Sequence, residues 1–267
     1  MMRALLLLFL PLGVYCQSFN PAPYLGMGNT GTAQKGIYSL EKNPAGIASL
    51  SSFTAASAYQ NHYLGTGIQT VALFIGAPLY SNSLIGVKAL SYGIPNTTKL
   101  NSFGIAYAKK IGSSFSSSIS VNHHRYYIKD HTNEKAFSAD LGFQWVVIKE
   151  LTFGVFYRNI TGSQFDIYAE QSIPNELLLG LHYKVSGSVA FSCDYAKDFN
   201  SAPSSVRIGI SYSASEKIYV NGGMSTQPQQ YYAGIGLVVL PFRIDFASSF
   251  HPYLGTSPQL ALLYAVR

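Results

Sequence analysis

Alternation of side chains with a period of two constrains this sequence more than any other feature. After about residue 52, large apolar residues alternate with small or polar ones almost to the end of the chain. For example, Val206, Ile208 and Ile210 alternate with Arg207 and Gly209. This period predicts β-strands with two chemically different faces. We expect fourteen strands, at about 53–63, 68–78, 84–94, 101–110, 114–128, 136–147, 151–159, 175–185, 188–196, 205–213, 217–224, 231–239, 242–250 and 258–266.

Charged residues follow the same alternation and fall on the small, polar face of these segments. A Lys or Arg that faced lipid near the middle of a membrane would cost about 2–4 kcal/mol. We therefore predict that the polar face lines a lumen and that the apolar face meets lipid. The residues predicted to line the lumen are Lys88, Asp140, Arg158, Glu176, His182, Lys184, Asp194, Arg207, Arg243 and Asp245.

The composition favours a membrane protein that crosses the bilayer with strands. Charged residues make up 11% of the chain, less than half their usual share in soluble domains, and aromatic residues 14%. No apolar run of 18 residues follows the first 16. Strands of 9–11 residues can cross the hydrocarbon, and their number is even, as in single-chain outer-membrane barrels. A soluble sandwich would also alternate, but it would not normally build its solvent face from Gly, Ala and Ser. The predicted fold is therefore an all-β, 14-stranded antiparallel transmembrane barrel with a short N-terminal plug in its lumen.

The chain divides into three parts. Residues 1–16 combine Arg3 with a short apolar core and predict a secretory signal peptide, with a lipid anchor on Cys16 as the alternative. Residues 17–50 predict the plug, and residues 51–267 the barrel. Tight turns belong on the periplasmic side and longer loops outside. We therefore expect both termini in the periplasm of a Gram-negative bacterium, and loop 160–174 over the outer mouth.

Several functional classes find no support in the sequence. Gly26, Gly28 and Gly31 match the dinucleotide fingerprint, but no strong strand precedes them and no acidic residue follows at the required distance. Adjacent His123 and His124 point to opposite faces of a strand and cannot share a metal ion. No hydrolase or metalloprotease motif is present. Basic residues are scattered rather than clustered, which argues against nucleic acid. We expect no enzymatic activity, no cofactor and no metal site.

Two motifs in the predicted plug carry a family resemblance. The sequence G-M-G-N-T-G-T-A, followed by N-P-A-G-I-A-S-L, resembles the N-terminal region of FadL-type outer-membrane proteins. It looks closer to the smaller PorV- and PorQ-type barrels. The resemblance implies fourteen strands around an N-terminal hatch, with Asn43, Pro44 and Ala45 near its periplasmic end. The residues of this predicted plug motif are Gly26, Gly28, Asn29, Gly31, Asn43, Pro44, Ala45 and Gly46.

Two functional hypotheses follow. The first, favoured by the short external loops, is a non-enzymatic accessory subunit of an outer-membrane complex for type IX secretion or barrel assembly. It predicts a larger membrane partner and a contact patch on the outer wall or rim. Four glycines on the expected strands mark either a kink in the wall or a close protein contact: Gly222, Gly223, Gly234 and Gly236. The alternative is FadL-like passive transport of small hydrophobic compounds. It predicts an apolar pocket between the plug and loop 160–174, and a lateral gap in the wall.

Overall fold

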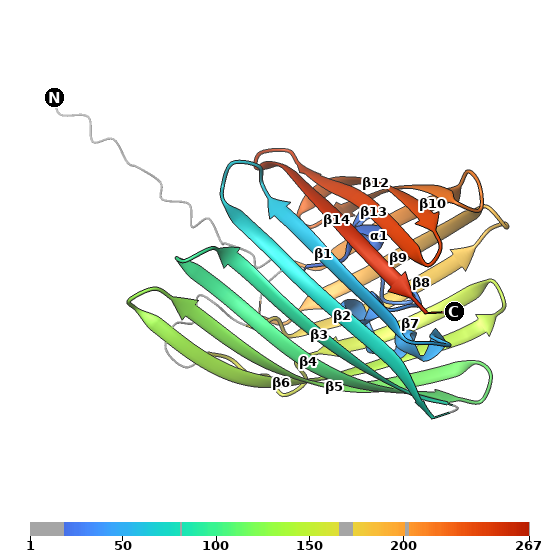
Figure 1. Cartoon of the computed structure of the whole chain (residues 1–267), viewed down its shortest axis with the longest axis horizontal. Coiled ribbons are helices and arrows are strands. Elements are labelled where there is room, and N and C mark those ends of the chain that lie inside the picture. Colours follow the sequence, from blue (N-terminus) through green and yellow to red (C-terminus); the bar gives the residue numbers. More distant parts are fainter. Residues whose placement is uncertain (1–18, 81, 166–172, 201–202, 267) are drawn as a thin grey trace.

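The chain forms a closed barrel of antiparallel strands around its N-terminal segment (Figure 1). The computed structural model describes residues 19–80, 82–165, 173–200 and 203–266. Within them, each of fourteen strands pairs with its neighbours in sequence, and β1 pairs with β14 to close the cylinder. The predicted fold class is confirmed. The strands are β1 Thr54–His62, β2 Ile68–Tyr80, β3 Ser83–Ile94, β4 Thr98–Ile111, β5 Phe115–Ile128, β6 Thr132–Ile148, β7 Leu151–Arg158, β8 Glu176–Lys184, β9 Val189–Asp198, β10 Ser205–Ser213, β11 Ile218–Thr226, β12 Gln229–Val239, β13 Phe242–His251 and β14 Gly255–Ala265.

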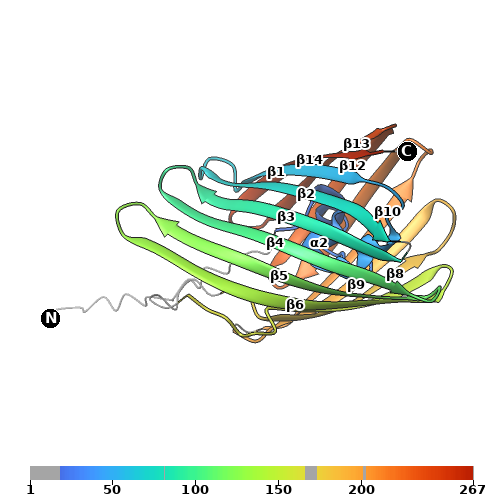
Figure 2. The same cartoon turned by 60° about the horizontal axis from the view of Figure 1, so that its bottom comes forward.

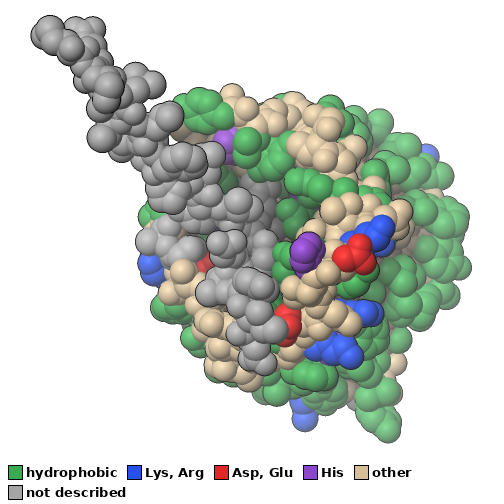
Figure 3. Space-filling view, turned by 90° about the vertical axis from the view of Figure 1, so that its left-hand side faces the viewer, with side chains coloured by type: hydrophobic (Ala, Val, Ile, Leu, Met, Phe, Trp, Pro, Cys, Tyr) green, Lys and Arg blue, Asp and Glu red, His purple; other side chains and the backbone are tan. Residues whose placement is uncertain are grey.

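The two faces of the wall differ as the alternation predicts. Ile210 and Phe143 are exposed on the outside by 51% and 40%, whereas Arg207 and Asp245 inside retain 8% and 1% of their surface. Viewed from one end, hydrophobic side chains form the flank of the cylinder, and charged ones gather at the end that faces the viewer (Figure 3). Strand pairing around the closed sheet satisfies the backbone N–H and C=O groups, and the apolar belt suits the lipid that would surround it. The barrel is therefore a transmembrane barrel. None of the described helices is long and apolar enough to cross a membrane.

The two ends of the barrel differ in their connections. At the turn end, tight turns follow β2, β4, β6, β8, β10 and β12, and the chain leaves after β14. At the loop end, the connection between β7 and β8 is much the longest. Two of the longer loops expected at this end, at 95–100 and 129–135, are not found. β4 and β6 begin earlier than the sequence suggests, so the connections at 95–97 and 129–131 are tight turns. The backbones of these strands stay hydrogen-bonded up to the turns, so the strands continue past the residues in which apolar and polar side chains alternate.

Cations also occur on the outer face, which the strand pattern did not assign. Lys99, Arg125, Lys135 and Lys197 face outward near the loop end, and Lys109 does so near the turn end. All five lie close to a strand terminus, where the cost of a charge falls to about 0–1 kcal/mol because the side chain reaches the interface. The separation of charges from lipid therefore holds in the middle of the wall and relaxes at its ends.

The N-terminal segment, residues 19–50, lies inside the barrel, and we call it the plug (Figure 2). It contains helix α1 Ala22–Gly26, helix α2 Ser39–Lys42 and the 3₁₀ helix η1 Pro44–Ser49. α1 packs mainly against β12 and β13, while η1 packs mainly against β4 and β5. The plug therefore crosses the lumen from one side of the wall to the other.

The predicted signal peptide, residues 1–16, lies outside the described residues, as do residues 166–172 of the long loop and the chain's last residue. The first described residue, Phe19, is buried in the lumen. The last described strand, β14, ends at the turn end, beside the start of β1. A periplasmic position for both termini stays a prediction.

Candidate functional site

Plug backbone lies directly against glycines of β10 and β11. A Cβ atom on Gly223 would lie 2.5 Å from the Cα atom of Gly28, and one on Gly209 would overlap the carbonyl group of Met27. Gly28 itself has φ +72°, a left-handed conformation that favours glycine. These positions accept no side chain because two backbones meet there. The contact sets the plug at a fixed height against this side of the wall.

The four glycines proposed as an outer contact patch do not form one. Gly223, Gly234 and Gly236 face the lumen, where Gly234 lies against Gly26 of the plug. Only Gly222 of the four faces outward, and a Cβ atom there would meet nothing within 4 Å. The expectation that all four meet lipid is wrong, because adjacent residues of a strand lie on opposite faces and β12 turns both of its glycines inward. Three of the four therefore make room inside the lumen.

Asn43 joins the plug to the wall. Pro44 follows it, and Asn43 is extended (φ −153°, ψ 95°), as expected for a residue before proline. Its side chain accepts a hydrogen bond from the backbone N–H of Ala45 at 3.2 Å and so caps η1. Its amide group donates to the carbonyl oxygens of Thr32 at 2.8 Å and of Phe143 in β6 at 3.0 Å. One buried side chain thus fixes a plug turn, a helix start and a wall strand.

Asp194 of β9 holds the middle of the plug. Its Oδ2 atom accepts hydrogen bonds from the backbone N–H groups of Gly31 and Thr32, at 3.0 and 3.1 Å. The Thr32 hydroxyl donates to the same atom at 2.7 Å. Three donors on a buried carboxylate compensate for the loss of hydration that burial imposes. Gly180 on the neighbouring strand leaves room for this carboxylate.

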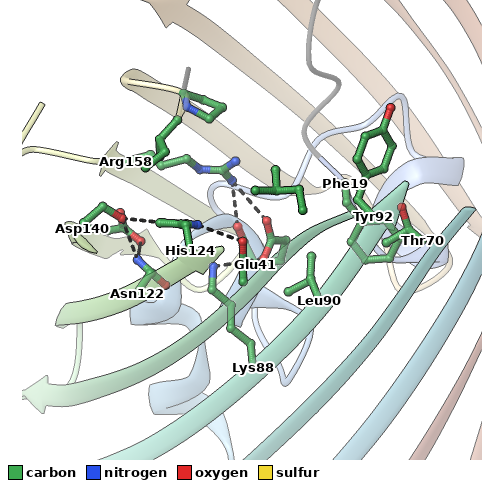
Figure 4. A pocket seen from close by; sticks show the side chains of 15 residues that line it. Phe19, Glu41, Thr70, Lys88, Leu90, Tyr92, Asn122, His124, Asp140 and Arg158 are labelled. Atoms are coloured by element: carbon green, nitrogen blue, oxygen red, sulfur yellow. Dashed lines mark hydrogen bonds and ion pairs between the residues drawn. The ribbon is translucent and has the colours of Figure 1, made fainter. Parts of the chain in front are cut away.

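A cavity of about 100 Å³ lies at the loop end of the lumen, between the plug and the wall (Figure 4). One part of its lining is apolar, and another is made of ionised and hydrogen-bonding groups. The apolar part consists of Phe19, Leu90, Tyr92, Leu100, Ile173 and Pro174. The polar part consists of Glu41, Thr70, Lys88, Ser102, Asn122, His124, Ser138, Asp140 and Arg158.

Glu41, at the start of α2, is the centre of an ionic cluster beside this cavity. Its carboxylate lies 3.0 Å from Lys88 Nζ and 3.6 Å from Arg158 Nη2. Arg158 also contacts Glu176 at 3.6 Å and donates a hydrogen bond to the Glu41 carbonyl oxygen at 2.9 Å. Figure 4 shows Glu41 between the two cations. The cluster ties α2 to β3 and β7.

The other polar side of the cavity is a hydrogen-bonded network within the wall. Asp140 accepts from Ser120 Oγ at 3.0 Å and from Asn122 Nδ2 at 2.8 Å. His124 contacts the hydroxyl groups of Ser102 and Ser138 at 2.8 and 2.9 Å. These groups are engaged with one another, so the wall presents a largely satisfied polar surface rather than a reactive one. Among the described residues, no three His, Cys, Asp or Glu side chains come together as a metal site.

The described parts of the long loop fold into the mouth of the barrel. Phe165 packs against Tyr126, with ring centroids 5.9 Å apart, and Ile173 joins the same buried cluster. Below this loop, the β6–β7 ladder ends at Leu141–Tyr157. The backbone N–H of Ile160 still donates to the carbonyl oxygen of Ala139, so residues 132–138 of β6 are the part without a described strand partner on that side. Every other adjacent pair is hydrogen-bonded along most of its length. A pocket lies at the predicted place, but only part of its lining is apolar. The end of the β6–β7 ladder is the one candidate for a lateral gap in the described wall.

Half of the ten predicted lumen residues lie at the cavity or contact the plug at Asp194, and the other half are dispersed. Lys88, Arg158, Glu176 and Asp140 gather at the cavity, while Asp194 lies beneath the middle of the plug. The remaining five lie apart from these. Arg243 pairs with Asp245 at 3.0 Å, and His182 contacts the hydroxyl group of Ser192. Arg207 is buried on β10, whereas Lys184 is exposed at the turn end.

The fold of this chain is similar to those of several solved outer-membrane proteins. A Ralstonia pickettii toluene transporter, TbuX, matches with a TM-score of 0.70 at 12% identity, over 94% of this chain and 99% of that one. The Pseudomonas putida toluene transporter TodX matches with a TM-score of 0.69 at 10% identity, over 93% and 99%. A Pseudomonas aeruginosa FadL homologue matches with a TM-score of 0.64 at 12% identity, over 93% and 98%.

This chain has a FadL-like fold. No family model and no curated protein matches the sequence. The likeness at these identities concerns the fold, and it supports the FadL side of the resemblance. The closer similarity of the FadL-like barrel to PorV- and PorQ-type proteins stays a prediction. Its structural neighbours are transporters and channels rather than enzymes.

Sequence reasoning missed two charged residues in this FadL-like barrel. Glu41 and Lys42 sit in the weakly helical stretch before Asn43, where no periodicity marks a buried position. Lys42 is fully buried, and its Nζ atom donates to the carbonyl oxygen of Asn29 at 3.3 Å. Burial holds the pKa of Lys42 well below its usual value. The clue available in the sequence was the charge pair itself inside a segment predicted to enter a lumen.

Proposed function

We propose that this protein is a passive channel for small hydrophobic compounds in the outer membrane of a Gram-negative bacterium. The loop end faces outward in this proposal, and the cavity beside Glu41 receives the compound. In this proposal the end of β14 lies on the periplasmic side, where the tight turns are, while Phe19, the first described residue, lines the cavity at the loop end. The lipid of the outer membrane surrounds the apolar belt, and the protein carries no cofactor.

The observation that carries the proposal is the cavity itself. Between the plug and the wall at the loop end, Leu90, Tyr92 and Leu100 surround open space. An apolar cavity of roughly 150 Å³ binds benzene in an engineered protein, so about 100 Å³ is of the right order for one aromatic ring. The adjoining polar groups favour a compound that is apolar with at most one polar substituent.

The structural neighbours support the same substrate class. Two of them are described as toluene transporters, and another as a monoaromatic hydrocarbon channel. The accessory-subunit hypothesis gains less support, because the proposed outer patch of glycines faces inward. A larger protein partner stays a prediction.

Passage through the lumen requires a change in the plug or in the wall. α2 and η1 close the route toward the turn end, and the ionic contacts of Glu41 hold them there. A compound in the cavity therefore leaves either past a displaced plug or sideways beside residues 132–138 of β6, which have no described strand partner toward β7. In both routes the cavity is the first binding site.

The experiment fills the cavity and measures uptake of radiolabelled toluene by whole cells that produce the protein. Ser102 lines the cavity, so Ser102→Trp fills it, and we expect uptake to fall to the level of cells without the protein. Ser117 on β5 faces outward at a similar exposure, so Ser117→Trp is the matched control and keeps wild-type uptake.

Two results would reject the proposal. One is wild-type uptake equal to that of cells without the protein, at equal amounts of folded barrel. The other is equal loss in both tryptophan variants, since only one of them changes the cavity. A difference in gel migration between heated and unheated samples verifies that each variant is folded.

A further inference from the structure

Like charges face one another on the outer wall at the loop end. Arg125 and Lys135 are direct partners in the β5–β6 register, and both side chains are exposed. Lys99 lies one step further out, because it pairs with Tyr127, two residues from Arg125 on the same face. Like charges directly opposite each other destabilise a sheet unless an anion is present.

The described part of the protein supplies no anion for this group. The outward positions of β3, β4, β5 and β6 hold no Asp or Glu, and Glu134 points to the opposite face from its neighbour Lys135. Arg125 donates from Nε to Asn133 Oδ1 at 2.8 Å. Its two terminal NH₂ groups have no acceptor among the described residues, and they have the geometry that binds phosphate oxygens in pairs.

A groove of about 440 Å³ adjoins the cations on the outer surface. Its floor is formed by small residues, Ala89 and Ser91 of β3, and its apolar sides include Leu73 and Phe103. Arg125 lies at its loop-end margin, because Ser91 pairs with Asn101 and Asn101 with Arg125. The groove is therefore apolar toward the middle of the membrane and cationic toward its surface.

We propose that this surface, which we call the lipid groove, binds a phosphorylated glycolipid of the surrounding leaflet. An acyl chain lies over Ala89 between Leu73 and Phe103, and the phosphate group lies between Arg125, Lys135 and Lys99. The cations attract the phosphate group at the membrane surface, and the apolar part of the groove contacts the acyl chain of the same molecule below it. This binding is separate from the lumen cavity and does not depend on the transport of any compound.

The test compares lipid retention by the full-length protein in native mass spectrometry. The purified barrel in neutral detergent is offered diphosphorylated lipid A, the same glycolipid without phosphates, or inorganic phosphate. We expect the phosphorylated glycolipid to bind at least about tenfold more tightly than the dephosphorylated one. In Arg125→Gln/Lys135→Gln this preference disappears. Removal of two facing like charges leaves the sheet at least as stable, so the variant folds.

A matched double variant controls for net charge. Lys109→Gln/Lys197→Gln also removes two outward cations, from other positions near strand ends, and it keeps the preference. Equal affinity of the wild type for both glycolipids would overturn the proposal, as would an equal loss in the two double variants. Full competition by inorganic phosphate would also overturn it, because it would assign the site to a free anion. Ala89→Phe fills the groove and weakens both glycolipids alike if the acyl chain lies there.

Discussion

On β10 and β11 the plug meets the wall backbone to backbone, whereas on β2–β5 it meets the wall through side chains. Gly223 touches the backbone of Gly28 on the first side. On the second side, Gly86 faces the methyl groups of Leu40, and Lys88 faces the carboxylate of Glu41. A backbone contact cannot adapt, but side chains can change rotamer. The cavity lies on the adaptable side, so the part of the plug beside it is the part that can move.

The largest effect expected from this difference is that of Glu41→Gln. Loss of the carboxylate leaves Lys88 buried without its anion, and breaking such a buried pair costs about 3–5 kcal/mol in the free energy of unfolding. Urea unfolding in lipid vesicles measures the loss. Hydrogen exchange should rise in residues 39–47, while residues 31–32 stay protected because Asp194 holds them independently.

The control is Glu41→Gln/Lys88→Met, which removes the unpaired cation and recovers part of the stability. Faster exchange throughout residues 26–47 in the single variant would contradict the comparison. It would show that the plug is held as one unit.

Gly223→Ala tests the rigid side. The new methyl group would lie 2.5 Å from the Cα atom of Gly28, and neither backbone can give way. Overpacking of this kind costs about 1–3 kcal/mol. The adjacent glycine is a built-in control, because Gly222→Ala points outward into open space and should change the unfolding midpoint little. Equal midpoints for the two variants would refute the backbone contact.

Gly86→Ala has the smallest expected effect and sharpens the contrast. The new methyl group would meet the terminal methyl groups of Leu40, which can rotate away. We expect a loss below about 1 kcal/mol in the same unfolding measurement. A loss as large as that of Gly223→Ala would mean that the plug is equally rigid on both sides of the lumen.

The candidate site was only partly predictable. Asp140 and Lys88 were assigned to the lumen because alternation fixes the face on which each residue lies. Their neighbours were not predictable, since a barrel brings together residues from distant strands. Glu41 shows the limit most clearly. It lies in a stretch where apolar and polar residues do not alternate regularly, and its partners come from β3 and β7. The glycines of β11 and β12 show another limit, because three of the four face the plug rather than lipid.

The sequence by itself determined the number of strands, the outward apolar face and the exclusion of ionised groups from the middle of the membrane. Each of these follows from a local period of two and from the cost of charge in lipid. Only the tertiary structure decided where the plug touches the wall, which charges meet, and where space remains. Those features depend on the register and curvature of the closed sheet, which bring Asp194 to Thr32 and leave a cavity beside Glu41.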